Sequence, residues 1–328
     1  MLPAHFPGQI SQRAQKAVLM HHGDRENLIL GIDYQISGAQ MPDHFAWVIS
    51  VPNEPDDYQL ADSAIFSQTR NWMAPLLKRW ERPRIGFGCG CATLGMPDST
   101  RPSLEFGEAA QVGPYSIQPV RGVGSDAVSA LNGWLQENGF PSEDPKHLAY
   151  FVEEKFTFLC IRVDAPAGAT AVAASAKLPP LQLSFRSERP YYPLLFSARQ
   201  GVFDLDLMML TEGRIDFDAS ADTLRKLAWS DALKRNVRIK SKEIPGALWQ
   251  ALSKSGEPPT RMYANRLICV GVNRGDSIFG WTEDVFLATG GRAKAQRRSG
   301  LPLLVTALAL IWLRWRAKPA RDALATRP

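Results

Sequence analysis

The chain has 328 residues, enough for one large domain or two, and 45% of them are hydrophobic, so material for a core is ample. The formal net charge is +5, but residues 292–328 contain nine basic residues and one acidic residue, so they carry +8 and residues 1–291 carry −3. Because a nucleic-acid-binding domain needs a basic surface of its own, this distribution argues against nucleic acid as a partner.

The first fifty residues show strand patterns and no export signal. Residues 1–10 have neither a charged n-region nor an apolar h-region, so no secretory signal is visible. Two apolar runs, residues 17–20 and 28–34, flank a polar turn that contains Gly23, and together they predict a β-hairpin. Residues 45–51 have the composition of a buried strand, which we expect to be central in its sheet and to end at the proline that follows. Its expected core residues include Phe45, Trp47, Ile49 and Val51.

A helix and a long irregular segment follow. Residues 62–79 carry apolar side chains at roughly helical spacing, and Pro75 is expected to break or restart the helix that they predict. Residues 82–108 are rich in Gly, Pro, Ser and Thr and show no sustained period. We therefore expect a loop or disordered insertion there, and the best place for a subdomain break.

Regular patterns resume after this segment. Residues 114–120 predict a strand, and Ser125-Asp126 would cap a helix that runs through Gln136 and stops at Gly139. Four later segments are strand-like: residues 155–163, 181–185, 202–210 and 266–272. Because strands and helices do not alternate steadily, we predict an α+β fold with mainly antiparallel sheet and a few packed helices.

The C-terminal end predicts a membrane anchor. Residues 301–313 contain no charge and lie between basic clusters. A run this short is more often a buried core helix, since a bilayer needs about 20 residues. Arg314 can bury its aliphatic stem, however, and Trp312 and Trp315 would lie at the interface.

We therefore divide the chain into four parts. These are a globular body (residues 1–290), a basic linker (residues 291–299), one transmembrane helix (residues 300–315) and a short basic tail (residues 316–328). Four basic residues precede the apolar run and five follow it, so charge does not fix the orientation.

A set of segments in chain order resembles one known family. The segments are residues 12–17, 33–34, 45–52, 112–115, 134–135, 190–194, 260–262 and 283–284. Together they resemble the uncharacterised bacterial family called domain of unknown function 2330, over about residues 9–287. The resemblance implies export, since similar proteins begin with a secretory signal and a Cys-containing mature start. This chain shows neither feature, and the resemblance implies no activity, ligand or catalytic residue.

Cys89 and Cys91 form the sharpest candidate site. A zinc site usually needs a second pair of ligands, which the sequence around these residues does not supply. A redox or disulfide role and a plain loop are the remaining interpretations, and export would favour the disulfide. Cys160 and Cys269 lie inside apolar strand patterns, so we expect them to be buried thiols.

Other catalytic patterns are weak. The sequence has no G-x-S-x-G motif, and the glycines of residues 86–90 lack the Lys-Ser/Thr that follows in a phosphate-binding loop. The carboxylate pairs Asp204/Asp206 and Asp216/Asp218 do not follow the spacing of a calcium loop, so we interpret them as solvent-facing rows. We assign no catalytic residue, metal or cofactor.

Two hypotheses of function remain. The first is a membrane-anchored envelope protein with a non-enzymatic binding or structural body, whose protein or ligand partner is unknown. The second is an enzyme whose Cys or carboxylate residues are dispersed in the sequence and meet only in the fold. We expect the body to be extracytoplasmic, with a cytoplasmic, tail-anchored protein as the alternative.

Overall fold

The structure is a computed structural model, and the chain divides into two compact units, Met1–Thr289 and Gly290–Pro328. It describes residues 1–3, 6–78, 103–124, 126–166, 168–194, 202–216, 236–253, 259–272, 285–287 and 289–290. The predicted transmembrane helix, residues 300–315, lies outside these ranges and stays a prediction. Among the described residues, no helix is long and apolar enough to cross a membrane.

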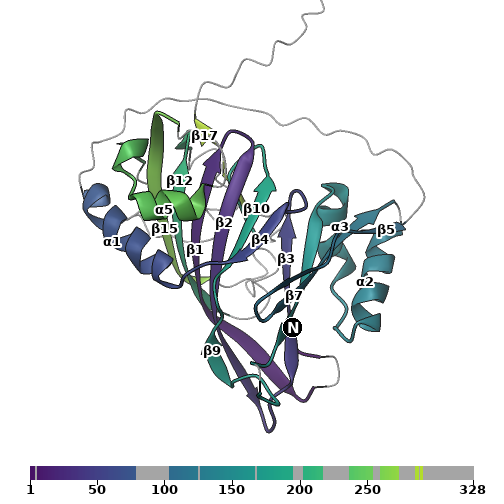
Figure 1. Cartoon of the computed structure of the whole chain (residues 1–328). Coiled ribbons are helices and arrows are strands. Elements are labelled where there is room, and N and C mark those ends of the chain that lie inside the picture. Colours follow the sequence, from purple (N-terminus) through teal and green to yellow (C-terminus); the bar gives the residue numbers. More distant parts are fainter. Residues whose placement is uncertain are drawn as a thin grey trace, which may run out of the picture. The chain divides into compact units, whose positions relative to one another are not determined.

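The larger of two main sheets, sheet 1, has eight strands in the order β14-β15-β12-β1-β2-β10-β4, with β9 paired to β2 (Figure 1). Its strands are β1 (Gly8–His22), β2 (Arg25–Gly38), β4 (Asp57–Leu60), β9 (Ser175–Lys177), β10 (Leu181–Arg186), β12 (Phe203–Thr211), β14 (Val237–Lys240) and β15 (Arg261–Val272). Strands β1 and β12 pair in parallel, and the other pairings are antiparallel. The predicted α+β class with mainly antiparallel sheet is therefore confirmed.

The predicted hairpin is the longest pairing in sheet 1. Strands β1 and β2 pair from Gly8↔Gly38 to His22↔Arg25, well beyond the apolar runs that indicated them. The two-residue turn places Gly23 at a φ of +61°, which glycine adopts without steric cost. A bulge between Gln12 and Ala14 interrupts the register.

The smaller main sheet, sheet 2, has five strands in the order β3-β8-β7-β5, with β6 paired to β7. Its strands are β3 (His44–Val51), β5 (Ser103–Phe106), β6 (Ala110–Val112), β7 (Tyr115–Val123) and β8 (Thr157–Asp164). Two expectations were wrong here. The end of the predicted loop 82–108 is strand β5, and β3 lies at the edge of its sheet and not at its centre. Both errors have the same cause. Strand β5 forms because it pairs with β7, and β3 is an edge strand because it pairs only with β8; both pairings involve residues distant in sequence.

The helices cover both main sheets from outside. They are α1 (Ala64–Lys78), α2 (Ala127–Glu137), α3 (Pro145–Glu153), the 3-10 helix η2 (Ser241–Glu243) and α5 (Gly246–Leu252). Helix α1 buries one stripe of side chains and runs through Pro75, so the predicted break there was wrong. Helix α2 ends near Gly139 as predicted, but Asp126 makes no side-chain capping bond, and Ser125 lies outside the described residues.

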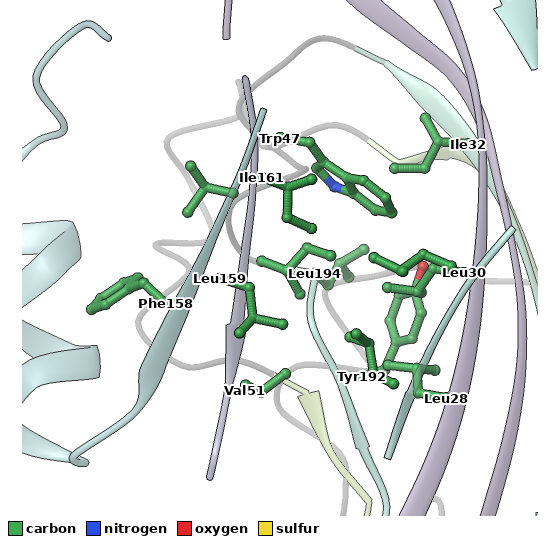
Figure 2. Close-up of a cluster of buried hydrophobic side chains, with 14 of the residues drawn as sticks. Leu28, Leu30, Ile32, Trp47, Val51, Phe158, Leu159, Ile161, Tyr192 and Leu194 are labelled. Carbon is green, nitrogen blue, oxygen red and sulfur yellow. The ribbon is translucent and has the colours of Figure 1, made fainter. Parts of the chain in front are cut away.

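The described core has two parts that define four layers. One part lies between sheet 1 and helices α1 and α5, and contains Val18, Ile29, Met73, Leu248 and Leu252. The other joins the opposite face of sheet 1 to sheet 2 and to helices α2 and α3. Figure 2 shows side chains of this second part, with Leu28, Leu30 and Ile32 facing Trp47, Leu159 and Ile161.

Four short described strands lie outside the two main sheets. Strand β11 (Tyr191–Tyr192) pairs with β16 (Val285–Phe286). Strands β13 (Arg214–Ile215) and β17 (Thr289–Gly290) complete the described set. Strand β11 belongs to a segment that the candidate site depends on.

Candidate functional site

The cysteines predicted as a candidate site are not placed by the structure. Cys89 and Cys91 lie outside the described residues. Cys160 and Cys269 are buried and free, as expected. Burial raises the pKa of each thiol to about 12, so both stay protonated near neutral pH and are poor nucleophiles.

The acidic pair on β12 is not a row facing solvent. Asp206 accepts two hydrogen bonds from Arg266, at 2.7 and 2.9 Å, and one from Arg70 of α1 at 2.9 Å. Its side chain is 15% exposed. Asp204 is exposed and accepts a hydrogen bond from the Gly271 amide at 3.0 Å. Asp206 therefore joins α1 to sheet 1, and the prediction that it faces solvent was wrong. Asp218, of the other acidic pair, lies outside the described residues.

A five-residue segment crosses between the two main sheets, and we call residues 190–194 the strap. Figure 2 shows Tyr192 and Leu194 of the strap between the side chains of the two sheets. The sequence of the strap is Pro-Tyr-Tyr-Pro-Leu, and both tyrosines are fully or almost fully buried. Prolines on either side leave only a two-residue strand, β11, because neither can donate to a ladder.

Tyr191 bonds to both sheets at once. Its backbone N–H donates to Glu26 Oε2 on β2 at 2.7 Å. Its hydroxyl donates to the carbonyl of Ser50 on β3 at 2.9 Å and lies 3.1 Å from the Ser50 hydroxyl. Tyr192 donates its hydroxyl to Gln15 on β1. The strap therefore fastens the inner face of sheet 1 to the edge strand of sheet 2.

An aromatic chain passes through Tyr191. Its ring centroid lies 5.5 Å from that of Phe156 and 6.4 Å from that of Phe185 on β10. Phe156 in turn lies 5.4 Å from Phe151 of α3. All three ring pairs meet edge to face, the arrangement that the aromatic quadrupole favours. The chain runs from the helix layer beside sheet 2 to the strands of sheet 1.

Glu26 is the only acidic residue in the buried core of the described chain. Its side chain is fully buried, and Oε1 has no hydrogen-bond partner among the described residues. Burial raises the pKa of Glu26 well above its usual value, and the hydrogen bond from the Tyr191 amide opposes this shift without cancelling it. Glu26 is therefore held in an environment that favours the neutral acid.

Little space remains beside the strap. A cavity of about 10 Å³ lies there, which is the room of about one water molecule. It is lined by Gln15, Leu30, Gly31, Ile32, Trp47, Val48, Ile49, Ser50, Tyr192 and Pro193. A second cavity of the same size lies under α2 and α3. Neither could hold a substrate larger than water without movement of the surrounding chain.

A second polar cluster lies at the outer end of sheet 2. His44 Nδ1 is 2.7 Å from Asp43 Oδ1, and Arg162 donates to Asp164 at 2.6 Å. Ser116 reaches Asp164 at 3.5 Å. Burial acts to raise the pKa of Asp43, but the hydrogen bond and charge of His44 and the charge of Arg162 outweigh it and lower the pKa. Because an ionised carboxylate only accepts hydrogen bonds, Nδ1 of His44 carries the proton in this contact.

The described residues include no group of three or more His, Cys, Asp or Glu side chains that could hold a metal ion. Sequence reasoning singled out neither Glu26 nor the pairing of Asp43 with His44. The sequence indicated residues 190–194 only as part of the family resemblance and not as part of a site. A signal was present for Glu26, since it lies in line with Leu28 and Leu30 on the apolar face of its strand.

Comparison with known proteins identifies a family. The model of the family described as "Uncharacterized protein conserved in bacteria (DUF2330)" matches residues 7–273. No curated protein matches the sequence. The crystal structure of baculovirus P35 aligns with a TM-score of 0.38 and a sequence identity of 9%. The alignment covers 85% of this chain and 91% of that chain. The crystal structure of the caspase-8/P35 complex is 8% identical, with a TM-score of 0.38 over 84% of this chain and 96% of that one. Scores this low carry no argument about fold or function.

Proposed function

Because the chain belongs to the DUF2330 family of uncharacterized proteins conserved in bacteria, we propose a function that rests on its own residues. We propose that it is a membrane-anchored envelope protein whose body is a non-enzymatic binding or structural module. In this proposal residues 300–315 hold the body at the membrane, and the body faces the extracytoplasmic side. A cytoplasmic body with the same C-terminal anchor is the alternative orientation.

The observation that carries the binding or structural role is the strap. It fills the space between the two main sheets and bonds to both of them through Tyr191. The cavity that remains has a volume of about 10 Å³. Small-molecule sites usually have about 300–1,000 Å³. The filled space between the sheets supports a body that meets other molecules through its surface.

The C-terminal sequence supports the anchor. Residues 301–313 lack charge, and Arg297, Arg298, Arg314 and Arg316 flank them. Guanidinium groups at both ends would lie among lipid headgroups, and the two tryptophans near the C-terminal end suit the interface. The net charge of +8 in residues 292–328 would add attraction to anionic lipids.

Fractionation of cells that express the full chain tests the anchor. We expect the full chain in the membrane fraction after a high-salt wash, because salt removes proteins held by charge alone. A chain truncated after Gly291 should move to the soluble fraction. A matched variant with Arg297 and Arg298 changed to Gln separates the two contributions, and it should stay in the membrane. Retention of the truncated chain would rule the anchor out.

The outer polar cluster of sheet 2 favours a second candidate function, a carboxylate-assisted hydrolase. His44 Nδ1 lies 2.7 Å from Asp43 Oδ1, and a histidine oriented by a carboxylate in this way can act as a general base. Hydrolysis of an activated ester by the full chain, lost in His44→Gln and retained in His22→Gln, would support this candidate. Equal rates in all three proteins would remove it.

A further inference from the structure

The strap rests on a carboxyl group that is unusually placed. Glu26 is fully buried on the core face of β2, where its neighbours along that face are apolar, beginning with Leu28 and Leu30. One carboxyl oxygen accepts the Tyr191 amide, and the other has no partner among the described residues. A buried carboxylate with one hydrogen bond is costly, whereas a neutral acid of the same shape is far less so.

Among the described residues, the groups packed around Glu26 include no cation that contacts it. The cross-strand neighbours are His21 on β1 and Phe185 on β10, and Tyr191 comes from the strap. His21 places Nε2 against the carbonyl of Ser187 at 2.8 Å. Burial lowers the pKa of His21 below its usual value. The hydrogen bond to Ser187 and the charges of nearby acids oppose this shift without cancelling it, so His21 is neutral near pH 7. The phenol of Tyr191 is the other titratable group at this position, and it bonds to Ser50.

We propose that the strap is a proton-controlled closure: the neutral form of Glu26 holds it between the sheets, and ionisation of that single carboxyl releases it. An ionised Glu26 gains hydration only if the strap moves away, because Tyr191 lies directly against it. Movement of the strap breaks the bond from Tyr191 to Ser50 and separates the ring of Tyr191 from Phe156 and Phe185. The inner faces of both sheets then become accessible at that end.

The sign of the effect follows from the two states. In the closed state burial raises the pKa of Glu26, whereas in the open state the hydrated carboxyl has its usual pKa near 4.5. Closure is therefore most stable below the ordinary carboxyl range, and it weakens as pH rises toward the pKa of the closed state. Within that window the open population grows by about tenfold for each pH unit, as linkage to one proton requires.

Hydrogen exchange of the Tyr191 amide tests this proposal directly, because this N–H is the donor to Glu26. The full chain in detergent is measured between about pH 5 and 8, and each rate is corrected for its intrinsic pH dependence. We expect the protection of this amide to fall by about tenfold per pH unit in the wild type. Protection in Glu26→Gln, which stays neutral, should not change with pH.

Glu188→Gln is the matched control. Glu188 is exposed, lies two residues before the strap and carries the same charge, so this variant should behave as the wild type does. Equal pH dependence in the wild type and Glu26→Gln, or constant protection in the wild type, would overturn the proposal. If Glu26→Gln does not fold, the carboxyl carbon of Glu26 is followed by NMR in the wild type. It should titrate together with the Tyr191 amide, and ionisation throughout the range would contradict the proposal.

Discussion

Within the core that the two main sheets share, one residue makes hydrogen bonds to both sheets. Tyr191 joins sheet 1 through its amide, sheet 2 through its hydroxyl and the helix layer through its ring. Each interaction alone is worth about 0.5–1.5 kcal/mol, but they act on one side chain and so support one another. We therefore expect a substitution of Tyr191 to destabilise the body more than a substitution of any other residue of the strap.

Tyr191→Phe removes the hydroxyl and keeps the ring. We expect it to destabilise the body by about 1–3 kcal/mol, because the buried hydrogen bonds to Ser50 are lost. Urea denaturation of the full chain measures this. Tyr263→Phe is the control, since Tyr263 is half-buried and its hydroxyl makes no hydrogen bond among the described residues; its change should stay within about 0.5 kcal/mol. Equal small effects in both variants would show that the hydroxyl of Tyr191 does not contribute.

The cysteines give a second test at this scale. Cys160 and Cys269 are buried with raised pKa values, so a maleimide should label them only after unfolding. We predict that Cys89 and Cys91 react in the reduced native protein, because four glycines within residues 86–95 favour an exposed loop. Elemental analysis accompanies the labelling. Stoichiometric zinc, or protection of Cys89 and Cys91, would contradict the loop interpretation and make this pair the leading functional site.

At the scale of elements, the sequence predicted those helices and strands whose formation depends on neighbouring residues. The hairpin, β3, β8 and α2 carry their own periodicity and turn residues, and all four are present. Helix α3 was missed although its signal was visible: Asp144 accepts a bond from the Lys146 amide, and Pro145 follows at the first helical position. The order of strands, including the parallel pairing of β1 with β12, depends on distant contacts and was not predictable from local patterns.

The same limit applies to the candidate site. The sequence indicates that Tyr191 and Tyr192 lie between prolines, but not that they cross between two sheets. It places Glu26 on an inward position of a strand, yet its contact with Tyr191 joins residues 165 positions apart. The Asp43–His44 pair is adjacent in sequence, and its neighbours Arg162 and Asp164 come from the paired strand β8.

Strand β3 supports a prediction about the core. Trp47 is 8% exposed although β3 is an edge strand, because its ring packs toward Tyr115 and the cavity beside the strap. We expect Trp47→Ala to destabilise the body by about 3–5 kcal/mol, which would threaten a typical domain. Val270→Ala, at a side chain 75% exposed, should change it by less than about 0.5 kcal/mol. A loss below about 1 kcal/mol for Trp47→Ala would mean that Trp47 is not part of the core.

At the scale of the whole molecule, our account joins a closed body to a charged C-terminal segment. The body, residues 1–291, carries −3, and the segment that follows carries +8. Like charges on the body and on anionic headgroups would keep the body itself off the lipid surface, while the basic segment is attracted to it. The central claim is that residues 300–315 hold this body at the extracytoplasmic face of a membrane.

Release of the body by trypsin from intact spheroplasts tests that claim most directly. Trypsin cuts after basic residues, and the linker of residues 291–299 contains Arg292, Lys294, Arg297 and Arg298. The control is a chain with these four residues changed to Gln, which removes the cleavage sites and leaves the anchor. We predict that the body of the unaltered chain appears in the supernatant while the spheroplasts stay intact, and that the control stays with the cells. A body that is released only after lysis would place it in the cytoplasm and contradict the account.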